Sequence, residues 1–265
     1  MVYKQCHQNR IVIDHYVMSL SRLEIEKIAE ETVGQYKNEK WYQVRKGKLL
    51  TSNFLDTENM CARIEKTKDK QLFAFQQIIK VELPRRRQCL AHNYNQTKRP
   101  ALQWGLDHES DALREYEKQT CRVVKPTGIW LFPSGNLGGS PDGLVYEYPF
   151  DEKPAGIIEA KCPFSMRHLK RIREDEWPFY LTYLDRHLKL KTGHNYYHTV
   201  MGNLEATQLP WCDFVIWTPS GMLTIRINAL EEMKARVRVI DNYYVKWMAP
   251  GNPYIKSGLD LSQQK

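Results

Sequence analysis

The stretch from Ser140 to Pro163 constrains the fold of this chain more than any other. It opens with a Pro-Asp-Gly turn that carries Asp142 and closes with a short apolar run that carries Glu159 and Lys161. Side chains alternate between the two faces of an extended strand, so Glu159 and Lys161 point the same way. If this strand pairs with the one that begins at Asp142, two carboxylates and one ammonium meet at one edge of a sheet. The stretch therefore predicts a β-hairpin with a charged cluster at its edge.

Such a cluster has the groups needed for metal-assisted chemistry on phosphate. Two carboxylates, here Asp142 and Glu159, can hold a divalent cation, and Mg²⁺ prefers few protein carboxylates together with waters. A lysine beside the metal, here Lys161, can orient an attacking water and offset charge that develops on a phosphate. The alternative is an ordinary hairpin with a surface salt bridge, because a short motif remains a hypothesis until its context is known.

A segment upstream, residues 101–113, adds a third carboxylate. Its apolar residues, with Leu102 and Leu106 among them, have the spacing of an amphipathic helix, and Pro100 suits the first helical turn. Glu109 lies on this predicted helix. Glu109 is either part of the charged cluster or one of several solvated acids on the helix surface.

A second upstream segment, residues 41–54, has groups that suit a phosphate. Guanidinium binds phosphate oxygens in a bidentate manner, which Arg45 can do. If a helix begins at Ser52, its hydroxyl would lie near unpaired backbone amides. The alternative for Arg45 is a surface charge.

Together these segments resemble the lambda-exonuclease-like family of the PD-(D/E)xK nuclease superfamily, also called the YqaJ-like viral recombinase or alkaline exonuclease family. The string Ser-Pro-Asp-Gly-Leu followed by Glu-Ala-Lys-Cys-Pro-Phe carries the resemblance. Glu109 matches the family pattern Trp-Gly-x-x-x-Glu-x-x-Ala, and Arg45 and Ser52 match its opening block. The blocks occur in family order from Trp41 to Trp217.

The resemblance implies a fold and an activity. The fold is α/β, a PD-(D/E)xK restriction-endonuclease-like fold with a mixed central sheet flanked by helices. The activity is that of a metal-dependent deoxyribonuclease, a 5′→3′ exonuclease that hydrolyses double-stranded DNA from its ends in recombination, repair or viral DNA processing.

The resemblance also assigns roles to residues of the site. Asp142, Glu159 and the backbone carbonyl of Ala160 would hold Mg²⁺ or Mn²⁺, and Glu109 would approach a second metal or its water. Lys161 would position and activate the attacking water. The 5′-phosphate of the DNA end would be held by three further residues, namely Arg45, Ser52 and Ser140.

One block departs from the family pattern. The family carries a Gln-x-Gln pair on a helix after the Glu-x-Lys strand, and Thr199 and Met201 stand at these two positions. Methionine cannot contact water or phosphate as an amide does. Either activity tolerates the change, a neighbour such as His198 or Asn203 substitutes, or catalysis is weakened or altered. Two alternatives therefore stay open: a DNA-end-binding protein with impaired catalysis, and an endonuclease or RNA-cutting relative. Thr51 also departs from the pattern, since a small alanine is usual there.

Composition agrees with one domain and a polyanionic partner. The 265 residues are 42% hydrophobic and 26% charged, which suffices for one sizeable core, and the net charge is +8. We expect a single nuclease domain over residues 1–265, with an N-terminal helical extension over 1–40, a family-like core over 41–217 and a C-terminal strand and helix over 218–265. By resemblance the partners are double-stranded DNA ends and a single-strand annealing protein, and the chain is a monomer or a homo-oligomer such as the trimer of lambda exonuclease.

The six cysteines form no Cys-x-x-Cys pair or zinc pattern, which indicates a reducing compartment. Cys162 and Cys212 lie in apolar runs and are expected to be buried thiols. The sequence has no apolar run long enough for a transmembrane span and no signal-peptide pattern. We therefore expect an intracellular protein, nuclear or cytoplasmic, with no membrane partner.

Local patterns predict the remaining elements. A capping box at residues 21–24 opens a helix, and a two-residue hairpin turn follows Thr218. The other expected elements are a helix over 68–83, a strand over 123–131, a largely helical segment over 165–190, a strand over 222–227 and a helix over 229–248.

Overall fold

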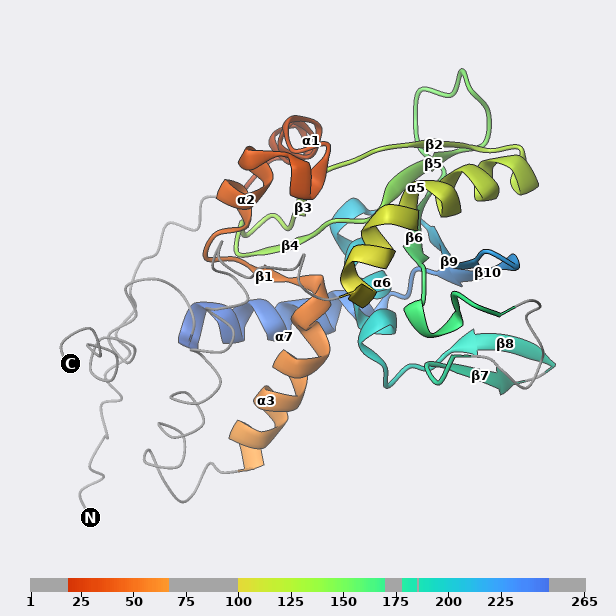
Figure 1. Ribbon diagram of the computed structural model, residues 1–265. Helices are drawn as coiled ribbons and strands as arrows, with labels where there is room; N and C mark the ends of the chain where they lie inside the picture. The colour runs from red at the N-terminus through yellow and green to blue at the C-terminus, as the bar shows by residue number, and fades with distance from the viewer. Residues whose placement is uncertain (1–18, 67–99, 170–177, 185, 248–265) are drawn as a thin grey trace, which may run out of the picture.

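The computed structural model describes residues 19–66, 100–169, 178–184 and 186–247 (Figure 1). The helix expected over 68–83 lies outside the described residues. None of the helices described is both long and apolar enough to cross a membrane.

A five-stranded mixed sheet forms the centre of the molecule, in the order β10-β9-β6-β5-β2. Its strands are β2 (Val123–Lys125), β5 (Gly143–Tyr146), β6 (Gly156–Lys161), β9 (Trp211–Thr218) and β10 (Gly221–Asn228). The pairing of β6 with β9 is parallel, and the other three pairings are antiparallel. Every residue of β6 from Gly156 to Ala160 is buried, as expected for a central strand covered on both faces.

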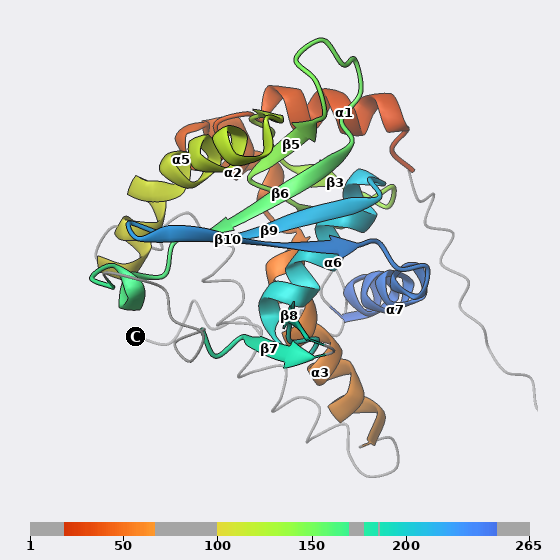
Figure 2. The ribbon, with the colours of Figure 1, turned by 90° about the vertical axis from the view of Figure 1, so that its right-hand side faces the viewer.

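The alternation of side chains along β6 and β9 explains the two layers of helices. Ile158 and Val215 face α5 (Pro100–Thr120) and pack with its Tyr116. Ile157 and Phe214 face the opposite way, toward α6 (Asn195–Thr207). Figure 2 shows α5 on one side of the sheet and α6 with α7 (Glu232–Trp247) on the other.

The N-terminal part of the described chain builds a second, small sheet beside α6. Its strands are β1 (Leu49–Leu50), β4 (Leu137–Gly139) and β3 (Trp130–Leu131), in that order. The adjoining helices and turns are α1 (Arg22–Glu31), η1 (Gln35–Lys37), α2 (Glu39–Arg45), η2 (Thr51–Asn53) and α3 (Phe54–Lys66). The predicted capping box is present, because Ser21 and Glu24 each accept a hydrogen bond from the other's backbone N–H.

The expectation of one continuous strand over 123–131 was wrong. This segment is divided into β2 and β3, which belong to different sheets. Pro126 and Gly128 lie between the two strands and interrupt them. Gly128 packs directly on α1, where an added Cβ would lie 2.4 Å from the carbonyl oxygen of Ala29. That close approach fixes the chain at the point where it changes sheets.

The segment over 165–190, expected to be largely helical, contains a β-hairpin among its described residues. After a short turn, η4 (Phe164–Met166), come β7 (Leu181–Leu184) and β8 (His187–Leu190). Leucines alternate with polar residues along β8, a two-residue period that favours a strand. By contrast, the hairpin turn after Thr218 is confirmed, since Thr218 pairs with Gly221, and the expected C-terminal helix is α7.

Candidate active site

The hairpin of β5 and β6 brings the two predicted carboxylates together. Gly143 pairs with Ile158, so Asp142 stands opposite Glu159 at the open end of the hairpin. The Oδ2 atom of Asp142 accepts a hydrogen bond of 2.7 Å from the backbone N–H of Ala160. Glu159 is buried, with a relative exposure of 5%. The edge cluster predicted from the sequence is therefore present.

Lys161 closes this cluster from the end of β6. Its Nζ donates to Oε1 of Glu159 at 2.7 Å and to the carbonyl oxygen of Ala160 at 3.0 Å. The same Nζ lies 5.3 Å from the centre of the Tyr196 ring on α6. A cationic group thus lies against two of the oxygens that were predicted to bind a metal ion.

The pKa values show how strongly these groups interact. Burial, followed by the charge of Glu159, raises the pKa of Asp142 well above its ordinary value. Burial alone would lower the pKa of Lys161, but the Glu159 and Asp142 carboxylates outweigh it and raise that pKa. Burial also raises the pKa of Glu109, which senses the charges of Lys161 and Glu159 from α5. The site therefore gathers three carboxyl groups around one ammonium, and ionising all three without a further cation is costly.

The oxygen donors fit a hard divalent cation. Asp142, Glu159 and the Ala160 carbonyl supply two carboxylates and one neutral oxygen, the type of donor set that Mg²⁺ and Mn²⁺ accept together with waters. In the described part of the chain, no three His, Cys, Asp or Glu side chains are grouped so that they could hold a metal by themselves. The donor set thus suits a cation that keeps part of its hydration shell.

Asn203 provides an amide next to the carboxylates. Its Nδ2 donates to Oε2 of Glu159 at 3.1 Å, and its Oδ1 accepts from the Thr51 hydroxyl at 2.8 Å. Of the two neighbours considered as substitutes for the missing glutamines, Asn203 is therefore the one that contacts the site. His198 instead lies 3.1 Å from Glu58, on the side of α6 that faces α3.

Thr199 and Met201, which stand at the positions of the two missing glutamines, take no part in the contact between Asn203 and Glu159. Met201 is buried in the core with an exposure of 2%, and the Thr199 hydroxyl donates to the backbone of its own helix. The glycine at position 139 leaves room for the Asn203 side chain, because a Cβ added to Gly139 would lie 2.2 Å from Oδ1 of Asn203. Sequence reasoning did not foresee that Thr51, unusual for its position, would orient Asn203.

Arg45 lies in a second cluster with Trp41 and Ser140. Its guanidinium carbon is 3.6 Å from the centre of the Trp41 ring, and Trp41 Nε1 donates to the Ser140 hydroxyl at 3.0 Å. Burial lowers the pKa of Arg45 to about 10, which leaves it charged at neutral pH. Its buried Nε has no hydrogen-bond partner among the described residues. A buried donor without a partner is uncommon and fits a site for an anion.

Ser52 lies at the same end of the small sheet. Leu50 pairs in parallel with Gly138, and two residues farther along each chain come Ser52 and Ser140. Ser52 is exposed, so its hydroxyl is accessible to a ligand. The structure thus brings together Arg45 and Ser140 through Trp41, a residue whose role as the support of Arg45 the sequence did not reveal.

Comparisons with known proteins agree with this description. The YqaJ-like viral recombinase domain matches residues 40–208 of the chain. The structure is similar to that of an alkaline exonuclease (LHK-Exo) from Laribacter hongkongensis, with a TM-score of 0.53, 22% identity and coverage of 79% of this chain and 92% of that one. It is equally similar to LHK-Exo in complex with dAMP, with a TM-score of 0.54 and the same identity and coverage. No curated protein matches the chain significantly in sequence. The likeness confirms the expected α/β fold of the PD-(D/E)xK type, with helices on both faces of a mixed sheet.

Proposed function

Since the chain belongs to the YqaJ-like viral recombinase family, we propose that it is a metal-dependent deoxyribonuclease that degrades double-stranded DNA from its ends in the 5′→3′ direction. The observation that carries this proposal is the cluster of Asp142, Glu159 and Lys161 at the end of the β5–β6 hairpin. We assign the activity to a single nuclease domain over residues 1–265. An annealing partner and a homo-oligomer such as a trimer remain predictions from the resemblance, and an intracellular location remains a prediction from the cysteine pattern and the missing signal-peptide pattern.

In the proposed mechanism, Asp142, Glu159 and the Ala160 carbonyl would hold Mg²⁺ or Mn²⁺, which would supply a Lewis acid for the scissile phosphate and its attacking water. Lys161 remains protonated because the neighbouring carboxylates raise its pKa. It therefore orients the water by donating a hydrogen bond and offsets negative charge on the phosphate, rather than removing a proton. Asn203 holds Glu159 in place through its amide.

The contact of Asn203 with Glu159 favours catalysis over the alternative of an end-binding protein with an impaired site. It supplies an amide to the carboxylate even though Met201 occupies the second glutamine position. The choice between an exonuclease and an endonuclease rests on the cluster around Arg45, whereas the choice between DNA and RNA rests on the substrate test below. A charged guanidinium with an unpaired Nε suits a terminal phosphate, which a closed circle does not have.

Digestion of matched substrates tests the proposed function. With Mg²⁺ or Mn²⁺, the purified chain is expected to release nucleotides from the 5′-ended strand at each end of linear duplex DNA and to leave covalently closed circles and RNA of the same sequence intact. EDTA is expected to stop the reaction, because the carboxylates alone cannot replace the Lewis acid. Gel and product-length analysis gives the readout, and cutting of closed circles or of RNA would instead support one of the alternatives.

Arg45→Ala is expected to abolish a preference for 5′-phosphorylated ends. Hydrogen bonds to charged groups contribute about 1.5–3 kcal/mol, so wild type should process phosphorylated ends about 10- to 150-fold more efficiently than 5′-hydroxyl ends. Backbone contacts along the duplex are the same in both substrates, so the ratio of kcat/KM values isolates the end pocket.

The neighbouring Lys46→Ala is the matched control for Arg45→Ala, since Lys46 is exposed and also cationic. It should leave the ratio unchanged. A wild-type enzyme that cuts both kinds of end at the same rate would disprove the end pocket.

A further inference from the structure

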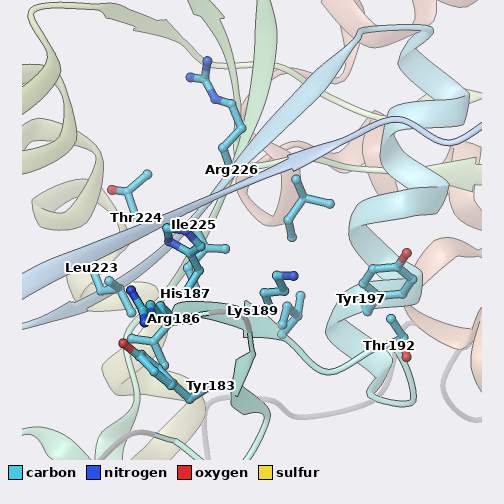
Figure 3. Close-up of a pocket in the computed structure, with 13 residues that line it drawn as sticks. Tyr183, Arg186, His187, Lys189, Thr192, Tyr197, Leu223, Thr224, Ile225 and Arg226 are labelled. Carbon is cyan, nitrogen blue, oxygen red and sulfur yellow. The ribbon is translucent and has the colours of Figure 1, made fainter. Parts of the chain in front are cut away.

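A groove lies between the β7–β8 hairpin and the edge strand β10, with a volume of about 730 Å³ (Figure 3). Its aliphatic floor includes Leu190 from β8 and Leu223 and Ile225 from β10. Tyr183 and Tyr197 lie toward opposite ends of this hairpin groove in Figure 3. None of these residues was assigned a role above, and the volume lies within the range of about 300–1,000 Å³ typical of ligand sites.

The charges of the hairpin groove favour an anionic ligand. Arg186, His187 and Lys189 line it, and no acidic residue is found among the lining residues that the structure describes. Arg226 is a further lining residue, but its side chain points away from the groove in Figure 3 and binds Asp213 through two hydrogen bonds. A ligand with both apolar faces and negative charges would therefore complement this surface.

Tyr183 is the group best placed for stacking. It has an exposure of 69%, although it is a large aromatic residue on a strand. Exposed rings next to cations bind single-stranded nucleic acid, because every base has a face that stacks and every linkage has a charge. In a duplex the base faces are covered by neighbouring bases, so this combination fits a single strand better than a duplex.

The hairpin groove also adjoins the proposed active site. Tyr196 and Tyr197 are consecutive on α6: the ring of Tyr196 lies 5.3 Å from Nζ of Lys161, whereas Tyr197 lines the groove. Tyr180, at the start of the hairpin, packs on Tyr196 with ring centres 5.0 Å apart. A strand leaving the active site past Tyr196 would therefore meet Tyr197, the next residue of α6, at the edge of the groove.

We propose that the hairpin groove binds single-stranded DNA, with bases stacked on Tyr183 and against the aliphatic floor and with phosphates near Arg186 and Lys189. The proposal rests on the proposed function, because digestion of one strand of a duplex leaves the other strand single next to the site. The groove then retains the enzyme on the DNA between successive cuts.

Binding of a fluorescein-labelled oligo(dT) to the full chain tests the proposal by fluorescence anisotropy. EDTA is present throughout, so that no cleavage occurs. Tyr183→Ala is expected to raise the Kd about tenfold or more, since loss of a stacking ring has effects of this size. Tyr183→Phe, which keeps the ring, should bind as wild type does. The matched control is Tyr148→Ala, whose side chain is 70% exposed on the far β5–β6 loop and which should also bind normally.

The outcomes separate this proposal from the proposed function. Normal binding by Tyr183→Ala, equal weakening by Tyr183→Phe, or no binding by wild type would each overturn it. Binding of an acidic amphipathic peptide that depends on Tyr183, without an effect on oligo(dT), would overturn it in favour of a protein partner. Oligo(dT) binding that depends on Tyr183 would stand even if linear duplex DNA were not cleaved.

Discussion

Asp142→Asn and Glu159→Gln are each expected to lower cleavage of linear duplex DNA by about a thousandfold or more. Each change removes one anionic oxygen of the proposed metal site and keeps the shape of the side chain. Loss of one preorganised group at a reacting centre costs about 10²- to 10³-fold, and weaker binding of the Lewis acid adds to this loss. In Asp142→Asn the new amide oxygen could still accept the hydrogen bond that Asp142 accepts from Ala160, so the hairpin should remain intact. Release of acid-soluble nucleotides with Mg²⁺ present measures the loss.

Stability measurements check that these variants stay folded. The pKa of Asp142 is raised in the folded state, so its ionisation costs stability as the pH rises above the unfolded value of about 3.9. At neutral pH without metal, Asp142→Asn should therefore have a Tm no lower than that of wild type. Glu205→Gln is the matched control, because it also replaces a half-buried carboxylate with a raised pKa. Glu205 lies on α6, and its pKa is affected by charges on and beside α7. Near-normal cleavage by both site variants would rule out the proposed metal site.

Lys161→Ala is expected to lose turnover while it retains its affinity for DNA. Lys161 acts on the water and on charge that develops during the reaction, so its removal should lower kcat by about 10²- to 10³-fold. Its absence also leaves Glu159 and Asp142 without their nearest cation, so folding is best compared with Mg²⁺ present.

The two effects of Lys161→Ala are measured separately, as kcat in Mg²⁺ and as the Kd for duplex DNA in EDTA. Lys125→Ala, a change of an exposed lysine on β2, is the matched control and should alter neither value. If the affinity falls as much as the rate, Lys161 is a plain phosphate contact, and its proposed role in orienting water is wrong.

The parts of this molecule that were predictable from sequence are those specified by local pattern. The alternation of Glu159 and Lys161 within an apolar run specified both the strand and the face on which the charges meet. The capping box at Ser21 and the turn after Thr218 were equally local and are confirmed. Family resemblance supplied the order of the blocks and hence the fold, which local pattern alone does not specify.

The parts that were missed depend on contacts between distant segments. Thr51 read as a departure from the family pattern, and only the approach of η2 to α6 shows that its hydroxyl orients Asn203. The β7–β8 hairpin was missed because its charged residues resemble a solvated helix, whereas its leucines repeat every second residue only over the four residues of β8. Cys212 is buried as expected, but Cys162, at the end of β6, is only partly buried.

The link from Thr51 through Asn203 to Glu159 has a consequence for how the activity arises during folding. Thr51 and Asn203 are 152 residues apart in sequence, and Asn203 and Glu159 are 44 apart. Contacts between such distant residues form only after the loops between them have closed, which makes them late events in folding. A nascent or partly unfolded chain would therefore carry the proposed metal ligands before Asn203 can hold Glu159 in position. On the proposed mechanism, cleavage is in this sense a property of the completed topology, and we expect a chain that has not yet folded to leave DNA intact.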